Sequence, residues 1–207
     1  MPTRERDASP AAGPNRPAME QAVRDFLQAA GIAPGDPELV DTPSRVTAAW
    51  ADEFLDGYQR TPADALGPLS PAPQGSGLVC ITHLDYTGIC PHHLLPYQGV
   101  AHIAYQPARL IAGFGRFAAL VDTLAHRLTL QETLARQVAD ALVQTLGATG
   151  VAVVLEADQT CMTVRGERRT RSRTTVDATG GNFDATDVAR LWSAIKSDGR
   201  SGATERR

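Results

Sequence analysis

In some segments of the chain, apolar positions recur every three to four residues and so share one face of a helix. The helices predicted in this way span residues 19–30, 42–56, 117–128, 134–146 and 184–195. Elsewhere, short runs rich in apolar and β-branched residues predict strands. These strands span residues 78–81, 99–105, 151–156, 160–165 and 170–176. This order of elements indicates an α+β fold, with an antiparallel sheet, a helix pair on one face and further helices N-terminal to it.

Segments with neither helical periodicity nor a strand-like apolar run set the predicted boundaries of the domain. Residues 1–17 are rich in proline, alanine and charge and are expected to form a disordered tail, as is the polar stretch 198–207. Between them, residues 18–77 are predicted to form a helical region that ends in a Pro/Gly/Ser-rich loop. Residues 78–197 then form one folded domain.

Composition limits the classes of function. The chain has 207 residues and a net charge of -3, which argues against general nucleic-acid binding. No apolar run approaches the roughly 18 residues of a membrane span, and the first residues lack the apolar stretch of a secretory signal. Three cysteines make a poor disulfide framework and suit a reducing compartment. We therefore expect a cytoplasmic protein that partners neither membranes nor nucleic acid.

A thiol and two imidazoles lie together in the stretch Cys90-Pro91-His92-His93, directly after an apolar segment. Cysteine and histidine are good zinc ligands, and a catalytic zinc needs three protein ligands. Alone this cluster is a weak signal, because such groups also occur by chance. Cys161 could supply a third ligand, although a single cysteine in a predicted strand is more simply a core residue.

Several motifs in a fixed order resemble the GTP cyclohydrolase I family. The zinc motif Cys-x-His-His of that family is similar to Cys90-Pro91-His92-His93, and its later cysteine before an Arg-Gly pair is similar to Cys161 with Arg165-Gly166. The resemblance extends from about residue 20 to residue 195. The further matching stretches are Asp41–Val46, Val100–Pro107, Gln131-Glu132, Gly150–Val153 and Thr174–Gly181.

The resemblance implies a tunnelling fold for the catalytic domain at 78–197, and subunits that associate side by side into a homodecamer. It implies Cys90, His93 and Cys161 as the ligands of a zinc ion whose fourth position is left for water. Zinc lowers the pKa of such a water to about 7, and the family reaction begins with attack of water on C8 of the guanine imidazole ring. His92 is then expected to be the proton donor to that ring.

The resemblance also assigns residues to the nucleotide. Glu132 is expected to read the guanine base, with Gln131 beside it in substrate binding. A competing interpretation makes Glu132 part of a helix capping box that begins at Thr129. Arg165 and Arg45 match positions that contact the triphosphate, and Arg116 matches a basic position. From the residues alone, these arginines are more simply solvated.

Three departures from the family pattern bear on the reaction. Gln159 stands where the family has a second acid–base histidine, and an amide cannot transfer protons at neutral pH. Phe114-Gly115-Arg116 replaces a Leu-Ser-Lys segment, and Ala119 replaces an arginine. With His92 and Gln159 as its catalytic positions, we expect a zinc hydrolase that opens the ring of a guanine nucleotide, GTP or GMP. We expect the reaction to stop at a formamido- or diaminopyrimidine nucleotide.

Three alternatives stay open or are set aside. A complete GTP cyclohydrolase I making 7,8-dihydroneopterin triphosphate would need another group, such as His83 or His102, in place of the missing histidine. A non-catalytic, zinc-stabilised nucleotide-binding oligomer would normally have four protein ligands, and three are evident. A zinc deaminase needs a His-x-Glu motif, which the chain lacks.

Overall fold

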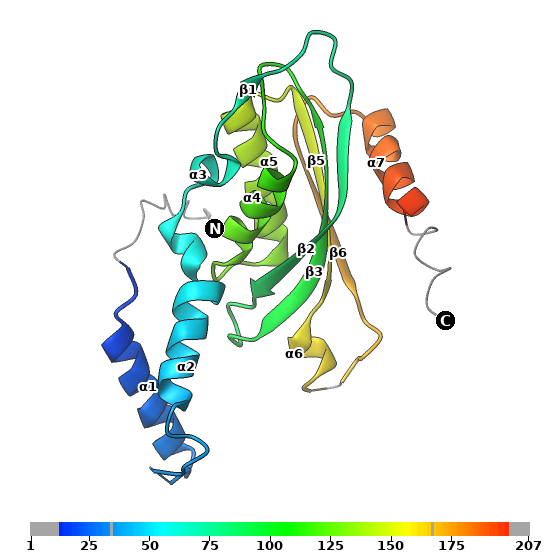
Figure 1. Ribbon diagram of the computed structural model, residues 1–207. Helices are drawn as coiled ribbons and strands as arrows, with labels where there is room; N and C mark the ends of the chain where they lie inside the picture. Colours follow the sequence, from blue (N-terminus) through cyan, green and yellow to red (C-terminus); the bar gives the residue numbers. More distant parts are fainter. Residues whose placement is uncertain (1–12, 34, 167, 199–207) are drawn as a thin grey trace, which may run out of the picture.

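A four-stranded antiparallel sheet forms the centre of the molecule (Figure 1). The structure is a computed structural model and describes residues 13–33, 35–166 and 168–198. The order of strands across the sheet is β2-β3-β5-β6. Their bounds are Val79–Ile89 for β2, Pro96–Gln106 for β3, Gly150–Asp158 for β5 and Thr174–Gly181 for β6.

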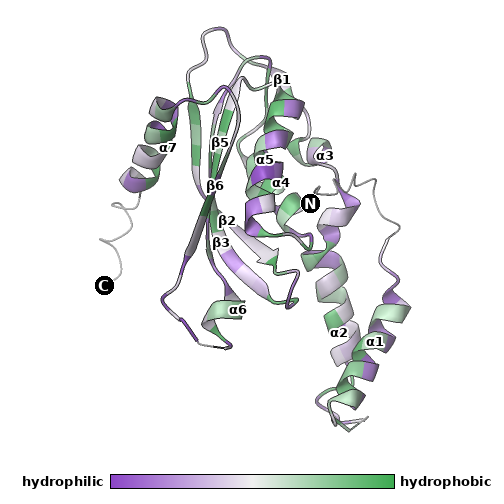
Figure 2. Cartoon of the chain, turned by 180° about the vertical axis from the view of Figure 1, so that it is seen from behind, coloured by the Kyte–Doolittle hydropathy of each residue, from purple (hydrophilic) through white to green (hydrophobic). Residues whose placement is uncertain are grey.

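Helices cover both faces of this sheet (Figures 1 and 2). The pair α4 (Gly115–Ala125) and α5 (Gln131–Leu146) packs against one face, and α7 (Ala185–Asp198) packs against the other. Because strand side chains alternate between faces, Ile103 joins the core beneath the helix pair while Ala104 joins the smaller core beneath α7. The predicted α+β class and the helix pair on one face are confirmed, and this is the arrangement of a tunnelling fold. The helix predicted over residues 184–195 forms α7, but its position as a third layer on the other face of the sheet was not predicted.

The N-terminal helices lie to one side of the sheet. Helix α1 (Arg16–Ala29) contacts α2 (Thr42–Ala49) and has no buried residue. Its apolar side chain Phe26 is 70% exposed. The helix begins at Arg16 because Asn15 caps it by accepting from the Ala18 amide. Of the tails predicted as disordered, residues 1–12 and 199–207 lie outside the described residues.

The segment between α2 and β2 begins within the helix predicted over residues 42–56, and its remainder is more structured than the predicted loop. A π-helical turn, η1 (Trp50–Phe54), continues α2, and the 3-10 turn η2 (Asp56–Gln59) follows. Helix α3 (Pro62–Leu66) forms next because Thr61 and Asp64 make a capping box. Strand β1 (Ser70–Pro71) pairs with β4 (Leu110–Ile111), which precedes α4.

The strand predicted over residues 160–165 is wrong. Residues Thr160–Thr163 form a short helix, α6, because the last residue of β5, Asp158, already pairs near the start of β3 and no strand continues the ladder beyond it. The carbonyl of Gln159 instead accepts the amides of Met162 and Thr163, at 2.8 and 3.1 Å. The strand predicted to begin at residue 170 begins only at Thr174. None of the described helices is both long and apolar enough to cross a membrane.

Candidate active site

The turn between β2 and β3 carries the Cys-Pro-His-His stretch. The amide of Leu94 donates to the Cys90 carbonyl at 2.9 Å, and the Cys90 amide donates to the Leu95 carbonyl at 3.0 Å. Leu94 takes a left-handed conformation, with φ of 51°, that closes the turn. This turn keeps the Cys90 side chain buried, while His92 and His93 are exposed.

Helix α6 brings the second cysteine to this turn. Cys161 lies in the first turn of α6 and is half-buried. The hydroxyl of the preceding residue, Thr160, donates to the Pro96 carbonyl at 2.7 Å, which ties α6 to the start of β3. The two cysteine-bearing segments are therefore joined by a direct hydrogen bond, although they are distant in the sequence.

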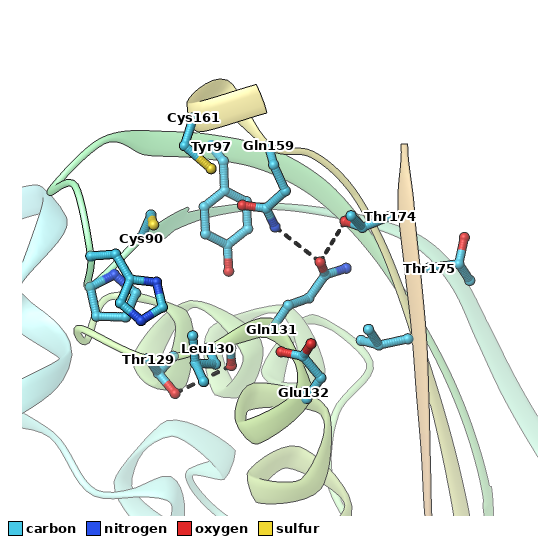
Figure 3. Close-up of a pocket in the computed structure, with 13 residues that line it drawn as sticks. Cys90, Tyr97, Thr129, Leu130, Gln131, Glu132, Gln159, Cys161, Thr174 and Thr175 are labelled. Carbon is cyan, nitrogen blue, oxygen red and sulfur yellow. Dashed lines mark hydrogen bonds between the residues drawn. The ribbon is translucent and has the colours of Figure 1, made fainter. Parts of the chain in front are cut away.

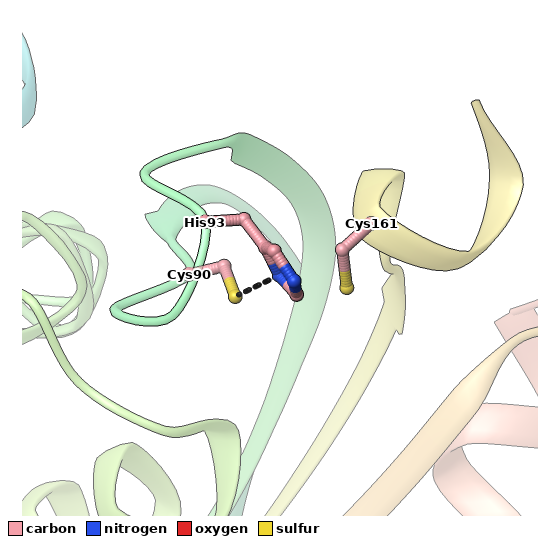
Figure 4. A group of neighbouring side chains, drawn as sticks. All are labelled: Cys90, His93 and Cys161. Carbon is pink, nitrogen blue, oxygen red and sulfur yellow. Dashed lines mark hydrogen bonds between the residues drawn. The ribbon is translucent and has the colours of Figure 1, made fainter. Parts of the chain in front are cut away.

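Cys90, His93 and Cys161 form one cluster of possible metal ligands (Figure 4). Their ligand atoms all lie within 4.8 Å of one another, and Cys90 Sγ lies 3.7 Å from His93 Nδ1. Burial and the neighbouring Cys90 raise the pKa of the Cys161 thiol. Two thiolates this close repel each other unless a cation lies between them, so the donor set suits zinc. Three donors leave one position of a tetrahedral site free.

A cavity of about 420 Å³ opens beside this cluster (Figure 3). It lies between the metal-ligand turn, the start of α5, the end of β5 and the start of β6. An isolated bridge between Ile89 and Leu128 holds the loop before α5 against the turn. The lining residues are Cys90, Pro91, His92, Tyr97, Thr129, Leu130, Gln131, Glu132, Gln159, Cys161, Thr174, Thr175 and Val176.

The start of α5 places Glu132 on the cavity wall without a capping role. The capping box expected from Thr129 to Glu132 is wrong, because Leu130 is the capping residue and makes no side-chain cap. The Thr129 hydroxyl contacts the Leu130 carbonyl, at 3.4 Å. In the part of the chain that the structure describes, no hydrogen bond or ion pair occupies the Glu132 carboxylate. It is exposed in the first turn of the helix, where the dipole favours an anion.

A chain of hydrogen-bonded side chains runs along the cavity wall from Gln159, two residues before Cys161, to the starts of α5 and β6 (Figure 3). Gln159 Nε2 donates to Gln131 Oε1 at 3.0 Å, and the Thr174 hydroxyl donates to the same oxygen at 2.6 Å. Gln131 Nε2 in turn donates to the Leu155 carbonyl at 3.0 Å. Gln159, the position where the family resemblance expects a histidine, is thus held by a second amide rather than by an acid or base.

Tyr97 lines the cavity, and the sequence patterns did not single it out. It lies opposite Gly88 in the β2–β3 pair, and its ring covers that glycine. The Tyr97 hydroxyl is buried and makes no hydrogen bond within the described residues. Burial raises its pKa to about 12, with Cys90 and Glu132 adding to the effect. Successive side chains of a strand point to opposite faces, so Tyr97 points to the same face of β3 as Ile103. This alternation in the sequence could have identified Tyr97 as an inward-facing residue.

The expected phosphate-binding arginines do not come together in the protomer. Arg45 is exposed on α2 and pairs with Asp41 at 3.0 Å. Arg116 is exposed at the start of α4, beside Gly67. Arg165 follows α6 and is close enough to lower the pKa of Cys161 slightly against the larger opposing effects. None of the three is among the residues that line the cavity.

The other histidines lie away from the cavity. His102 is fully buried on the α7 face of the sheet, where its Nδ1 accepts from the His83 amide at 3.2 Å. Its Nε2 lies 3.6 Å from the Glu156 carboxylate. His126 bonds to Asp56 at 2.6 Å, near the end of α4. Of the five histidines, His92 alone lines the cavity and His93 belongs to the ligand cluster.

Known proteins resemble the chain over most of its length. The family model of GTP cyclohydrolase I matches residues 19–196. GTP cyclohydrolase 1 of Chromobacterium violaceum is 41% identical over 173 residues, which cover 84% of each chain. GTP cyclohydrolase 1 of Leifsonia xyli subsp. xyli is 42% identical over 172 residues, 83% of this chain and 90% of that one. The chain therefore belongs to the GTP cyclohydrolase I family.

Proposed function

We propose that this protein opens the imidazole ring of a guanine nucleotide at C8 and releases it as a formamido- or diaminopyrimidine nucleotide. Membership of the family makes the chain a hydrolase of the GTP cyclohydrolase type. The proposal adds to family membership that the reaction stops after ring opening. One observation carries it: Gln159 occupies the cavity wall, and His83, His102 and His126 are elsewhere.

Cys90, His93 and Cys161 would hold zinc. Their two thiols and one imidazole match the ligands that zinc prefers. When bound there, zinc supplies a water that ionises near neutral pH and can attack C8. Three protein ligands fit a catalytic site better than a structural one, which normally has four. This argues against a purely structural role for the metal.

His92 is the proton donor in this proposal. It lies on the cavity wall next to the ligand His93, with their ring centroids 6.3 Å apart. Protonation of N7 makes C8 more electrophilic and places a proton where the opened ring needs one. Imidazole suits this step because its usual pKa lies close to neutral pH.

Glu132 reads the base. Its free carboxylate at the start of α5 can accept hydrogen bonds from the ring N–H and the exocyclic amine of guanine. Both groups lie on the edge of the base away from C8. The base would then lie across the cavity, with its imidazole ring toward the cysteines. This orientation brings C8 and N7 to the side that carries His92.

The later steps of the family reaction require further proton transfers. After ring opening, the ribose must isomerise and a second ring must close. The wall that faces these atoms offers the amides of Gln159 and Gln131 and the hydroxyl of Thr174. None of these groups exchanges a proton readily at neutral pH. The ring-opened nucleotide is therefore the product.

The phosphate groups and the assembly are linked in this proposal. Arg165 stands nearest the cavity, whereas Arg45 and Arg116 face solvent in the protomer. A homodecamer or another ring-shaped homo-oligomer in the cytoplasm would bring such arginines from one copy to the cavity of the next. Their charge suits a nucleotide triphosphate, and GMP would be held less tightly.

Mass spectrometry of zinc-loaded protein incubated with GTP, and separately with GMP, tests the reaction. The proposal expects a nucleotide that has gained one water, or one that has gained two waters and lost one formic acid, because hydrolysis of the formamide consumes the second water. Glu132→Gln should weaken nucleotide binding about 10- to 100-fold, as expected for a lost hydrogen bond to a charged group. Glu38→Gln, which is exposed before α2 and is not among the residues that line the cavity, is the matched control. Unchanged nucleotides in every incubation would contradict the proposal.

The second candidate is a complete GTP cyclohydrolase I. It is favoured by the name of the relatives at 41% and 42% identity. Pteridine fluorescence after incubation with GTP distinguishes it, because only ring closure produces that signal.

A further inference from the structure

The neighbours of Gln131 fix both ends of its amide. Its nitrogen donates to the Leu155 carbonyl, so its oxygen faces the opposite way. There the oxygen accepts from Gln159 and from Thr174, which uses both of its lone pairs. Gln131 is only 6% exposed. Its oxygen therefore has no capacity left to accept from a nucleotide.

The orientation of Gln159 follows from that of Gln131. Because Gln159 Nε2 is engaged by Gln131, its carbonyl oxygen must point away from Gln131. Figure 3 shows this oxygen on the side where Tyr97 and Cys90 lie. An amide oxygen can only accept a hydrogen bond. Gln159 thus presents to the cavity a hydrogen-bond acceptor of fixed orientation.

A fixed acceptor at this place discriminates between the two states of the nucleotide. On its imidazole ring, intact guanine presents N7 as an acceptor and no N–H group. Addition of one water breaks the C8–N9 bond and leaves C8 as a formyl group on N7. The water oxygen goes to C8, and its two protons go to N7 and N9. Two N–H donors appear that the intact nucleotide lacks.

We propose that Gln131 and Thr174 are positioning residues that fix Gln159 as an acceptor, and that this acceptor makes the cavity prefer the ring-opened nucleotide to the intact one. The inference rests on the proposed function, since the ring-opened nucleotide is the species the site would hold. It replaces the expectation that Gln131 contacts the substrate itself. It also gives the Gln159 amide a role in binding, at a position where it cannot transfer protons.

Titration calorimetry with GTP and with its formamidopyrimidine derivative tests the preference. The zinc-loaded His92→Asn protein is the background, because its slow ring opening leaves GTP intact during the titration. Gln159→Leu and Gln131→Met should each reduce the preference for the opened ligand about tenfold, the effect of one hydrogen bond. The double variant should show no further reduction, because both changes remove the same interaction. Gln144→Met, exposed on the same helix, is the matched control.

Each outcome separates the inference from its alternatives. If Gln131→Met weakens both ligands alike, also in the Gln159→Leu background, Gln131 contacts the nucleotide and the inference is overturned. Should Gln131→Met not fold, Thr174→Val removes one of the two donors to the same oxygen. A reduced preference in that variant supports the inference, and an unchanged preference overturns it.

The proposed function can fail independently of this inference. Suppose that the wild-type protein never opens guanine, but that the protein prefers the opened ligand and the variants lose this preference. This result overturns the proposed function and leaves the binding inference standing. Ring opening together with a preference that no variant changes overturns the inference alone.

Discussion

The two sides of the cavity differ in what they can do with a proton. The side formed by the β2–β3 turn and α6 carries two thiols and two imidazoles, which are groups that can bind a metal or exchange a proton. The other side carries Gln159, Gln131 and Thr174, which stay neutral. Attack on the guanine ring needs the first side, and the later rearrangements need proton transfer at the second. Under the proposed function, the comparison teaches that this site is equipped for the start of the reaction sequence and not for its end.

The largest expected effect comes from removing a metal ligand on the first side. Cys161→Ala should abolish stoichiometric zinc binding and reduce ring opening by at least about a thousandfold, since the metal contributes several kcal/mol. Cys80→Ala is the matched control, because Cys80 lies on β2 beneath α7 and outside the ligand cluster. Zinc content by atomic emission and nucleotide consumption are the measurements. A Cys161→Ala protein with full zinc content would remove Cys161 from the site.

The next effect concerns the proton donor. His92→Asn should slow ring opening by about 10²–10⁴-fold while zinc content stays at that of the wild type, because a general acid acts on the rate and not on the metal. His83→Asn is the control, and asparagine tolerates the left-handed backbone that His83 adopts, with φ of 60°. Initial rates at saturating GTP give the readout. A large loss in His83→Asn and none in His92→Asn would reverse the assignment.

A gain of function tests the second side. Gln159→His restores an imidazole on the amide wall and should raise the fraction of product that closes to a pteridine by about tenfold, a conservative share of what one acid–base group contributes. The rate of ring opening should change little, because the metal ligands are untouched. Gln159→Glu is the companion variant, since it adds a titratable group with a different pKa. Pteridine yield that is the same in all three proteins would show that the amide wall does not limit the later steps.

The smallest effect concerns stability on the far face of the sheet. Burial, followed by the nearby His83, lowers the pKa of His102, although Glu156 opposes the shift. The unfolded chain therefore binds more protons than the folded chain as the pH falls through the usual histidine range, and the free energy of unfolding should decrease from about pH 7.5 to about pH 5.5. Burial lowers the pKa of His126 as well, so His102→Gln should reduce this slope and not abolish it. Urea unfolding of zinc-free protein measures it, and a steeper slope in the variant would contradict the assignment.

Local patterns predicted the parts of the fold that local physics decides. The apolar and β-branched runs of β3 and β5 follow from short-range geometry, as does the apolar stripe of α5, which ends at Gly147 in a left-handed conformation. The same patterns failed at α6, where Thr160 and Val164 favour a strand but no neighbouring strand is available to pair with them. The tertiary context decided that segment.

The candidate site was predictable to the extent that its residues are close in sequence or carried by the family resemblance. Cys90, His93 and Cys161 were expected to lie together, and the structure brings them together. The amide chain could not be predicted, because it joins Gln159 to Gln131 across 28 positions and Thr174 to Gln131 across 43. Such hydrogen bonds leave no periodic signal. The same holds for the Tyr97 hydroxyl, whose setting depends on α5 as well as on its own strand.

The ratio of pteridine formed to GTP consumed, measured on the zinc-loaded wild-type protein, tests the central claim most directly. Fluorescence gives the pteridine, and mass spectrometry gives the remaining GTP and the ring-opened pyrimidine nucleotides. The account predicts a ratio of about one per hundred or less, given the contribution of one missing acid–base group, with pyrimidine nucleotides making up the balance. A ratio close to one, with 7,8-dihydroneopterin triphosphate as the main product, would contradict it.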